Sequence, residues 1–341
     1  MARQETLKVW KDCPPGYRSD WRGPNLIVQY KDYEKLNGEF ERLVSRVGDG
    51  SIIKRFDKTP TPRKTNDVVC PHFLELKWAT GCPYSCAWCY LQGTFRFLDY
   101  KTMPKMKDRA KVKEHLKAFL ESETSHRELL NSGELADSLM DEDQERPFSS
   151  FMVDLFDTQS LHRVLFLTKS ANVDNLLKLT NKSHIVVSFS INAERVSQRW
   201  EKAPSVLERI EAAGILKDAG FEVRIRIDPM VPIEDWKVCY SSILDRLFSR
   251  LTPNRVTIGS LRGLQSTINN SRDKSWTVYL EEKSNWGKKI NIESRFEMYT
   301  HLIQTMKNDF GFSRIALCKE TVEMWERLGI NYKQIECNCT W

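Results

Sequence analysis

The stretch ATGCPYSCAWCYLQGTF, residues 79–95, places three of the chain's nine cysteines within eight positions. Cys82, Cys86 and Cys89 follow a CxxxCxxC spacing on a loop that opens with a glycine. A structural zinc site takes four protein ligands, usually from two separated pairs, whereas an iron–sulfur cluster takes one protein ligand per iron. Three cysteines therefore predict a four-iron, four-sulfur (4Fe–4S) cluster with one iron open to a non-protein ligand. The alternatives are zinc completed by a distant Cys or His, and three buried apolar cysteines.

Length and composition describe a chain that can bury a full core. It has 341 residues, 40% of them hydrophobic, and its ten Trp, ten Tyr and sixteen Phe argue against disorder. The net charge of +6 permits a polyanionic partner without requiring one. No signal-peptide pattern opens the sequence, and no apolar run approaches the roughly 18 residues of a membrane span. We therefore expect a cytoplasmic protein with no membrane association, whose clustered cysteines bind metal or carry redox chemistry.

Short β-rich runs alternate with amphipathic helical runs around and after this loop. Strands are predicted at 72–81, near the start of 127–138, and at 163–169, 184–192, 221–229 and 255–262. Helices are predicted at 109–122, 172–180, 205–220 and 235–251. About six βα units imply an α/β fold, built as a partial (β/α)6 TIM-like barrel with right-handed crossovers. The cysteine loop should then lie at the carboxyl ends of the strands, where such folds bind ligands.

Three parts are predicted along the chain. Residues 1–66 carry the basic, proline-bearing stretch KRFDKTPTPRKTND and are interpreted as a linker or extended arm, and residues 67–262 form the barrel. Residues 263–341 form a C-terminal extension. It is predicted to hold a polar loop at 266–277, a helix near 294–309, a strand at 313–319, a short helix and a tail with a CxC motif.

The cysteine loop directly after the first barrel strand resembles the radical S-adenosylmethionine (SAM) superfamily. The stretches TGCPYSCAWCYLQ, VLFLTK, VVSFSIN and RIEAAGILKDAGFEV are similar to spore photoproduct lyase and its wider family. The resemblance implies that Cys82, Cys86 and Cys89 hold a 4Fe–4S cluster. It also implies cleavage of SAM to a 5′-deoxyadenosyl radical that abstracts hydrogen from a substrate. An electron donor such as flavodoxin or ferredoxin is the implied protein partner, and a nucleic acid or nucleoside is the implied substrate class.

The same resemblance assigns contacts with SAM to residues near predicted strand ends. It places Trp88 against the adenine of SAM. The SAM amino group is received by the stretch Ser132, Gly133 and Glu134. Two further polar positions that hold SAM are Lys169 and Ser190. Without the resemblance, a serine or lysine at a strand end is an ordinary solvated residue.

One position departs from the family pattern. Spore photoproduct lyase has a catalytic cysteine, which quenches the product radical, just ahead of the stretch that matches SGELADS. Asn131 occupies that position here, and no cysteine lies between Cys89 and Cys239. The tyrosine after the third cluster cysteine is retained as Tyr90, a predicted catalytic residue. Because an amide cannot deliver a hydrogen atom as a thiol does, the sequence predicts inefficient repair of spore photoproduct.

The remaining thiols of interest lie near the end of the sequence. Cys318, Cys337 and Cys339 are candidate ligands of an auxiliary iron–sulfur cluster or zinc. Alternatively, Cys318 is catalytic and donates hydrogen at the barrel mouth, or it is simply buried while the tail frays without a ligand. A shared metal requires the tail to fold over the barrel mouth.

Two classes of function follow. The first is a radical SAM enzyme of the spore photoproduct lyase type acting on a nucleobase or DNA lesion, or on a peptide or small metabolite with an auxiliary cluster. The second is a non-catalytic iron–sulfur or zinc-binding protein. Trp88, Glu134 and Lys169 favour the enzyme, because a structural cluster needs no SAM contacts. The basic, aromatic stretch 94–113 predicts either a nucleic-acid surface or a solvated helix face.

Overall fold

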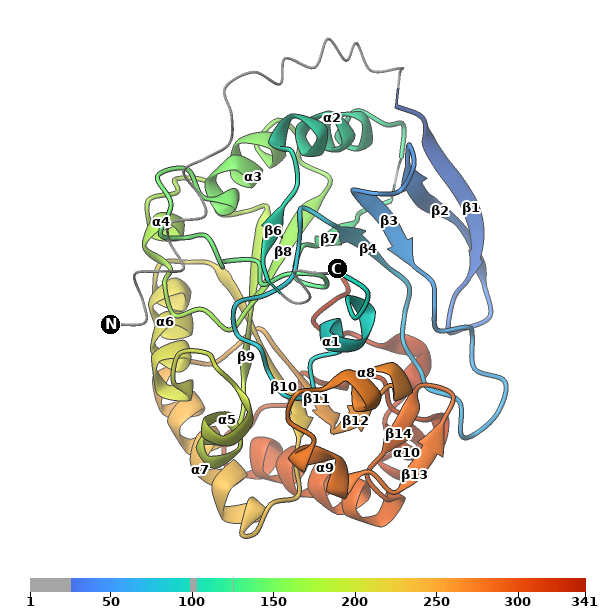
Figure 1. Cartoon of the computed structure of the whole chain (residues 1–341), viewed down its shortest axis with the longest axis vertical. Helices are drawn as coiled ribbons and strands as arrows, with labels where there is room; N and C mark the ends of the chain where they lie inside the picture. Colours follow the sequence, from blue (N-terminus) through green and yellow to red (C-terminus); the bar gives the residue numbers. More distant parts are fainter. Residues whose placement is uncertain (1–25, 99–102, 125) are drawn as a thin grey trace.

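Seven parallel strands form the centre of the fold, within a ten-stranded sheet of order β1-β2-β3-β4-β7-β8-β9-β10-β11-β15 (Figure 1). The computed structural model describes residues 26–98, 103–124 and 126–341. The parallel strands are β4 Phe73–Leu76, β7 Leu129–Asn131, β8 Arg163–Thr168, β9 Ile185–Ile191, β10 Glu222–Met230, β11 Arg255–Ser260 and β15 Ile315–Leu317. The predicted α/β fold is confirmed, and β4 to β11 supply its six βα units.

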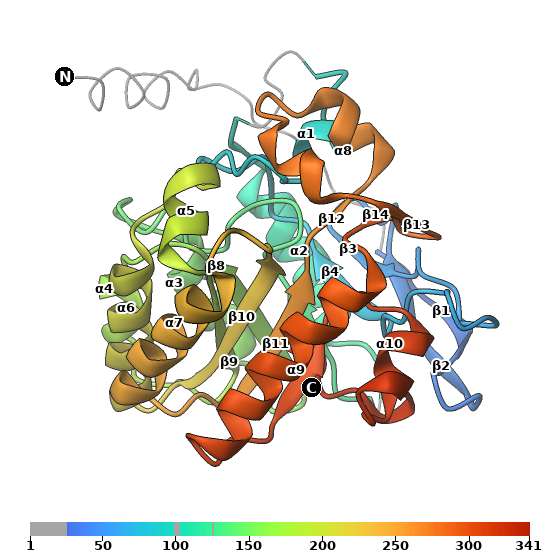
Figure 2. The same cartoon turned by 90° about the horizontal axis from the view of Figure 1, so that it is seen from below.

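Helices cover the outside of the parallel strands (Figures 1 and 2). They are α2 Arg109–Leu120, α3 Phe148–Phe156, α4 Asp174–Leu177, α5 Glu194–Trp200, α6 Val206–Asp218, α7 Trp236–Arg250 and α9 Ile292–Asn308. The first residues of α2 and α6 follow from the sequence. Asp108 caps the start of α2, and Ser205 forms a capping box with Glu208 at the start of α6. Strand β9 is buried along its whole length, as expected for a strand covered on both faces.

The sheet crosses both predicted domain boundaries. In the described part of the N-terminal segment, β1 Val28–Glu34, β2 Phe40–Val47 and β3 Ile53–Phe56 are antiparallel, and β3 pairs with β4. The interpretation of this segment as a linker or arm is therefore wrong from residue 28 to residue 56, while residues 1–25 lie outside the described residues. At the other side, β15 pairs with β11 and is a seventh parallel strand.

Smaller elements build the rim of the barrel. They are β5 Ala79–Thr80, β6 Lys105–Met106, β12 Arg262–Gly263, β13 Glu282–Ser284, β14 Gly287–Lys289, α1 Leu91–Thr94, α8 Gln265–Asn270, α10 Val322–Arg327, and the 3-10 helices Ser275–Tyr279 and Tyr332–Gln334. The polar loop predicted at 266–277 is thus partly helical. Helix α8 packs against α1 so closely that a Cβ on Gly93 would meet the Thr267 nitrogen at 2.6 Å. None of the helices in the described ranges is long and apolar enough to cross a membrane.

The tail segment, residues 337–341, lies inside the barrel near the ends where the strands begin. Arg224 NH1 donates to the Asn338 oxygen at 3.0 Å, and Arg255 NH2 donates to the Trp341 oxygen at 2.7 Å. In Figure 2 the end of the chain lies opposite α1 and α8, which flank the mouth. The tail therefore neither frays nor folds over the mouth, so both of those expectations are wrong.

Candidate active site

A cavity of about 340 Å³ opens at the carboxyl ends of the parallel strands. The loop after β5 contributes Cys89 to its wall, β10 contributes Arg226 and Asp228, and the tail segment contributes Cys337 and Cys339. Cavities of this size bind small molecules and cofactors. Thiols from two distant parts of the sequence therefore face one site.

The cluster loop, residues 81–90, is fixed to its neighbours through its backbone. Gly81 adopts a positive φ of 87° and its nitrogen donates to the Leu135 oxygen at 2.8 Å. The Ala87 nitrogen donates to the Trp200 oxygen at 2.9 Å, and the Lys202 nitrogen donates to the Tyr84 oxygen at 3.0 Å. These bonds hold the loop against the region around α5, so the thiols have defined positions.

The three loop thiols form a donor set that fits an iron–sulfur cluster. Burial raises the pKa of all three, that of Cys86 to about 12. Burial raises the pKa of Cys82 most, and the negative charges of Asp137, Cys89 and Cys86 raise it further. Because Cys89 and Cys86 act on the pKa of Cys82, the three thiols are neighbours. Buried thiols that oppose one another's ionisation are ionised when metal binds, because bound cations reverse the local charge balance.

Lys169 and Ser190 are brought together beside these thiols. Lys169 Nζ donates to Ser190 Oγ at 2.6 Å and lies 3.2 Å from Glu201 Oε1, while Arg209 NH1 lies 2.8 Å from Glu201 Oε2. Although burial opposes it, Glu201 raises the pKa of Lys169. The Lys169 charge in turn favours the thiolate form of Cys86. A fixed cation thus lies next to the cluster loop.

The stretch after β7 is placed at the cavity in part. Gly133 and Glu134 line the cavity, and a Cβ on Gly133 would meet Leu167 Cβ at 2.5 Å, so only glycine fits there. Ser132 is buried, and its hydroxyl donates to the Leu165 oxygen at 2.9 Å, away from the cavity. The hydroxyl of Tyr90 donates to the backbone oxygen of Glu134.

Aromatic rings form much of the remaining wall. Trp88 lines the cavity, and its ring centroid lies 5.8 Å from that of Trp200. Phe56 and Trp286 line it as well, and Lys319 Nζ lies 4.1 Å and 3.8 Å from their ring centroids. The sequence assigns no site role to these last three residues: Phe56 lies on β3, in the segment interpreted as an arm, and Trp286 and Lys319 lie in the C-terminal extension.

Cys318 lies in the cavity beside a buried ion pair. Arg262 donates to both carboxylate oxygens of Asp228, at 2.7 and 2.9 Å, and to Cys318 Sγ at 3.5 Å. Although burial opposes ionisation, Arg262 lowers the pKa of Asp228 to about 2. Burial and the Asp228 charge raise the pKa of Cys318 to about 12. Cys318 is therefore a neutral thiol at physiological pH.

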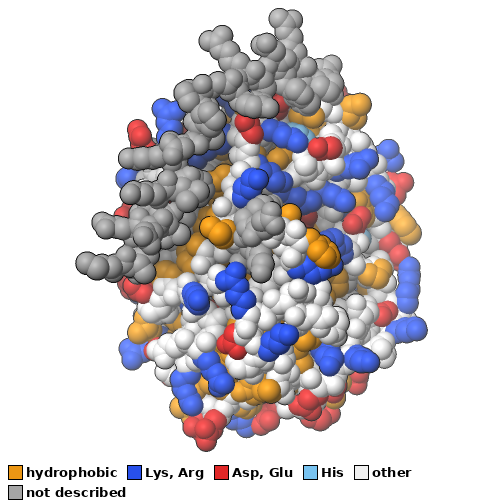
Figure 3. All heavy atoms as spheres, viewed as in Figure 1, with side chains coloured by type: hydrophobic (Ala, Val, Ile, Leu, Met, Phe, Trp, Pro, Cys, Tyr) orange, Lys and Arg blue, Asp and Glu red, His pale blue; other side chains and the backbone are white. Residues whose placement is uncertain are grey.

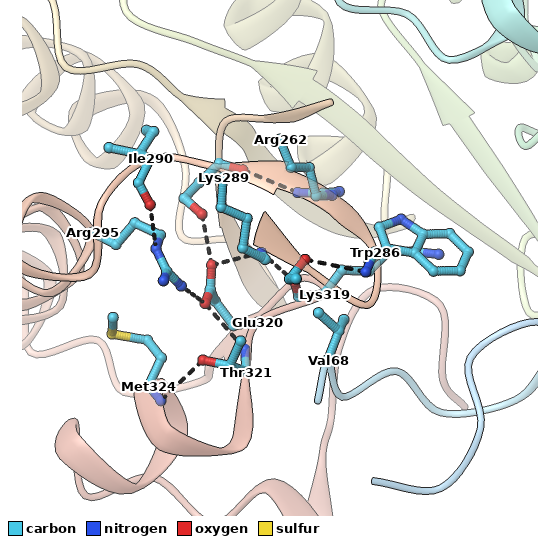
Figure 4. A network of polar contacts seen from close by, with 12 residues as sticks. Val68, Arg262, Trp286, Lys289, Ile290, Arg295, Lys319, Glu320, Thr321 and Met324 are labelled. Atoms are coloured by element: carbon cyan, nitrogen blue, oxygen red, sulfur yellow. Dashed lines mark hydrogen bonds and ion pairs between the residues drawn. The ribbon is translucent and has the colours of Figure 1, made fainter. Parts of the chain in front are cut away.

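A buried network next to Cys318 fixes this wall (Figure 4). Glu320 accepts from Lys289 Nζ at 3.0 Å, from Arg295 NH1 at 2.5 Å and from Ser260 Oγ at 2.6 Å. Lys289 Nζ also donates to the Lys319 backbone oxygen at 2.7 Å. Although burial opposes it, Lys289 and Arg295 lower the pKa of Glu320 to about 2. The carboxylate thus stays charged and anchors the segment that carries Cys318 and Lys319.

The two tail thiols are buried at the base of the cavity. Cys339 Sγ accepts from Arg226 NH2 at 2.9 Å and from Asn131 Nδ2 at 3.7 Å. A hydrogen bond with Cys337, together with burial, raises the pKa of Cys339. Cys70, to which the sequence assigned no role, also lines the cavity.

Metal binding by the second group of thiols finds no support in this geometry. Among the residues that the structure describes, no group of three or more His, Cys, Asp and Glu side chains is arranged to hold a single metal ion. This finding covers Cys318, Cys337 and Cys339, the candidate ligands for zinc, and equally Cys82, Cys86 and Cys89. It concerns a single ion, whereas a 4Fe–4S cluster takes one thiol per iron.

The basic stretch 94–113 is amphipathic where it is helical. Figure 3 shows Lys and Arg side chains scattered over the described part of one face, with hydrophobic and acidic side chains among them. Within residues 94–113, α2 exposes its lysines and buries Val112, Leu116 and Phe119, while residues 99–102 lie outside the described residues. The helical part is therefore an amphipathic helix with a solvated face.

Comparison with known proteins places this site in a family. The family model for spore photoproduct lyase matches residues 74–258, which is 185 of the 341 residues. The chain belongs to the spore photoproduct lyase family. The match extends from β4 through the cluster loop to β11, so it contains all the residues assigned to the first cluster and to SAM.

Individual relatives match part of their length. Spore photoproduct lyase of Clostridium acetobutylicum is 31% identical over 100 residues, covering 29% of this chain and 30% of that protein. Spore photoproduct lyase of Bacillus subtilis is 28% identical over 184 residues, covering 52% of this chain and 51% of that protein. The matched regions thus span about a third and about half of these relatives.

Solved structures of the family share the fold. Spore photoproduct lyase complexed with dinucleoside spore photoproduct gives a TM-score of 0.59 at 18% identity, covering 72% of this chain and 75% of that chain. A mutant of the lyase with bound AdoMet and dinucleoside spore photoproduct also gives 0.59 at 18% identity, covering 75% and 79%. The barrel of the family is therefore present here.

Proposed function

We propose that this protein is a radical SAM enzyme of the spore photoproduct lyase type, acting on a nucleobase lesion such as the dinucleoside spore photoproduct. The observation that carries the proposal is the set of three neighbouring loop thiols, of which Cys89 lines the cavity and Cys86 feels the charge of Lys169. Relatives of this fold bind AdoMet and dinucleoside spore photoproduct. A cytoplasmic location and an electron donor of the flavodoxin or ferredoxin type are parts of the same proposal.

The residues of the site would share the work as follows. Cys82, Cys86 and Cys89 would hold a 4Fe–4S cluster, which together with SAM supplies a 5′-deoxyadenosyl radical for hydrogen abstraction. Trp88 would pack against the adenine of SAM, and Glu134 would accept a hydrogen bond from its amino group.

The polar pair beside the loop and the ring behind it would have supporting roles. Lys169 Nζ would neutralise negative charge close to the loop thiols, and Ser190, 2.6 Å from it, would keep the ammonium group oriented. The Tyr90 hydroxyl, which donates to the Glu134 oxygen, would hold Glu134 at the cavity wall. Fixing these groups before the substrate binds reduces the reorganisation that the reaction needs.

Anaerobic reconstitution tests the proposal. The protein is loaded with iron and sulfide, reduced with dithionite, and mixed with SAM and dinucleoside spore photoproduct. We expect 5′-deoxyadenosine and repaired thymines, each identified by mass spectrometry. Efficient repair would contradict the prediction made from Asn131 and would require another thiol in place of the cysteine that is absent there. Absence of 5′-deoxyadenosine from protein with a full cluster would overturn the radical SAM assignment. Formation of 5′-deoxyadenosine without thymines would overturn only the choice of substrate.

The auxiliary cluster remains a second candidate on chemical grounds alone. Cys318, Cys337 and Cys339 are soft ligands that line one cavity. Iron analysis of the reconstituted protein decides this point. Iron beyond the content of one four-iron cluster, lost on substitution of Cys337 and Cys339 by Ser, would support the auxiliary cluster.

A further inference from the structure

We propose that Cys339 donates the hydrogen atom that completes the reaction on the substrate. The proposal rests on the proposed function, in which loss of a hydrogen atom leaves a carbon radical on the substrate. That radical has to take a hydrogen atom from a weak bond nearby, and the S–H bond of a thiol is among the weakest X–H bonds that the common side chains offer. A buried thiol at the base of the cavity meets this need.

The position of Cys339 distinguishes it from Cys89 and Cys318, two other thiols of the cavity. Cys89 belongs to the cluster loop, and Cys318 faces the Asp228–Arg262 ion pair. Cys339 Sγ instead lies 3.7 Å from Asn131 Nδ2, at the end of β7. Asn131 stands where the family has its catalytic cysteine. The tail segment therefore places a thiol, that of Cys339, next to the position where β7 has none.

Asn131 also joins Cys339 to the proposed SAM contacts. Its Nδ2 donates to Glu134 Oε1 at 2.9 Å, and its Oδ1 accepts from the Gly133 nitrogen at 2.9 Å. One amide therefore contacts both Cys339 and the stretch expected to receive the SAM amino group. The thiol is only one side chain removed from that stretch.

The neighbouring residue holds the thiol in place. Asn338 is fully buried, and its Nδ2 donates to Ser188 Oγ at 2.8 Å and to the Ile225 oxygen at 2.9 Å. Its Oδ1 accepts from Thr257 Oγ1 at 2.8 Å. These bonds fix the tail to β9, β10 and β11. A donor must be fixed in this way, since hydrogen transfer depends steeply on the placement of the reacting atoms.

The proposed step balances as a hydrogen-atom transfer. The S–H bond of Cys339 breaks homolytically, a C–H bond forms on the substrate, and a thiyl radical remains on Cys339. One electron from the one-electron donor protein that serves the cluster, and one proton from water, then restore the thiol. No atom of the tail is lost, so the step can recur in each turnover.

Disulfide trapping tests the placement without cofactor or substrate. In Asn131→Cys, mild oxidation should join the new thiol to Cys339, because the Asn131 side chain already contacts Cys339 Sγ, at 3.7 Å from Nδ2. Peptide mapping would identify the cross-link. Asn131→Ser and the double variant Asn131→Cys/Cys339→Ala are the matched controls and should give none. A folded Asn131→Cys protein that forms no disulfide with Cys339 would overturn the placement.

Isotope transfer from solvent tests the role. In D2O the Cys339 thiol exchanges to S–D, so thymine released from dinucleoside spore photoproduct should carry deuterium. We expect Cys339→Ala to lower the ratio of deuterated thymine to 5′-deoxyadenosine at least about tenfold, since this thiol contacts Asn131. Cys239→Ala, a change in a thiol on α7 outside the cavity, should keep the wild-type ratio. Asn131→Cys in the Cys339→Ala background should restore deuterium transfer.

The outcomes separate the two proposals. An unchanged ratio in Cys339→Ala would overturn the donor role and leave the proposed function intact. A wild-type protein that forms no 5′-deoxyadenosine would overturn the proposed function and the donor role with it. One that forms 5′-deoxyadenosine but no thymine would overturn the choice of substrate and the donor role on that substrate.

Discussion

The cluster loop and the tail segment bring thiols to the same cavity by different physical means. The loop is a contiguous stretch that follows a strand and is held by backbone hydrogen bonds, such as that from Gly81 to Leu135. The tail crosses the barrel interior and is held by the side chain of Asn338, which reaches three strands. A site built from one short motif can be predicted from residue spacing alone. A site built from residues far apart in the sequence can be found only once the fold is known.

Their electrostatic supports also differ. The cluster loop lies beside a charged group in which Glu201 and Arg209 are fully buried and the Lys169 side chain is 14% exposed. The tail thiol has a cation, Arg226, but it is otherwise surrounded by neutral hydrogen bonds, including that from Asn131. Ionic support next to the loop is suited to a charged cluster, and the more neutral surroundings of the tail are suited to a thiol that transfers a hydrogen atom.

The largest expected effect comes from removing the loop thiols. We expect the triple change of Cys82, Cys86 and Cys89 to Ala to abolish the visible absorption of the reconstituted cluster and all SAM cleavage, because no other thiols replace them as a set. Iron analysis and 5′-deoxyadenosine formation check this. Cys239→Ala is the control. A triple variant that keeps both signals would show that the cluster lies elsewhere, and the tail would then be its first alternative.

Sequence patterns were sufficient for the parallel strands and insufficient for the N-terminal hairpin. Strands such as β9 are mostly apolar and are buried along their whole length, the pattern expected of a strand covered on both faces. The N-terminal segment carries charges along β1 and β2 and a basic proline stretch, so it was interpreted as a linker. The pair Asn37 and Gly38, where Gly38 has a φ of 88°, is a hairpin signal that was available.

The second expected effect is a loss of stability next to the loop. Glu201→Gln leaves Lys169 and Arg209 buried without a counter-charge, and we expect it to cost about 3–5 kcal/mol of unfolding free energy. Urea unfolding measures this loss. Glu211→Gln, which breaks the exposed pair of Glu211 with Arg250, should cost at most about 1 kcal/mol. Equal costs for the two variants would show that the buried group does not support the loop region.

This effect should depend on pH with a defined sign. Although burial opposes it, Lys169 and Arg209 lower the pKa of Glu201 in the folded protein. A depressed carboxyl pKa stabilises the fold above the unfolded value of about 4.3, and this contribution is lost as the pH falls through the folded pKa. The stability difference between wild type and Glu201→Gln should therefore be full near neutral pH and shrink below about pH 4.

The tail could not be placed from its sequence for a physical reason. The stretch CNCTW has neither periodicity nor length, so it gives no signal of burial. Its position depends on Arg224, Arg255 and Thr257, which lie far from it in the sequence and become its partners only once the barrel has closed. The sequence shows the CxC motif, but the contact of Cys339 with Asn131 exists only in the folded barrel.

A third, smaller effect is expected at the anchor of the tail. Asn338→Ala removes the partners of Ser188, Ile225 and Thr257 inside the barrel, and we expect a cost of about 2 kcal/mol. It should also speed cleavage of the tail by thermolysin. The control is Asn331→Ala, an exposed position whose change should cost about 0.5 kcal/mol. Unchanged stability and protease resistance would mean that the tail is held by other contacts.

The smallest expected effect concerns Trp341, which ends the tail segment. Its ring packs against Leu129, Leu165 and Val186, and the guanidinium carbons of two arginines lie near its centroid, that of Arg127 at 5.6 Å and that of Arg163 at 5.4 Å. Each such cation–π contact contributes roughly 0.5–1 kcal/mol at an exposed site.

Because the ring is partly exposed, we expect Trp341→Ala to cost about 1 kcal/mol in urea unfolding, and Trp341→Phe to recover part of that cost. The change lies beyond the anchor at Asn338, so Cys339 should stay in place. The disulfide between the Asn131→Cys thiol and Cys339 should therefore still form in a Trp341→Ala background. Loss of that cross-link in a folded protein would mean that the Trp341 ring, rather than Asn338, holds the thiol at the cavity. Trp341 would then be the anchor of the tail segment.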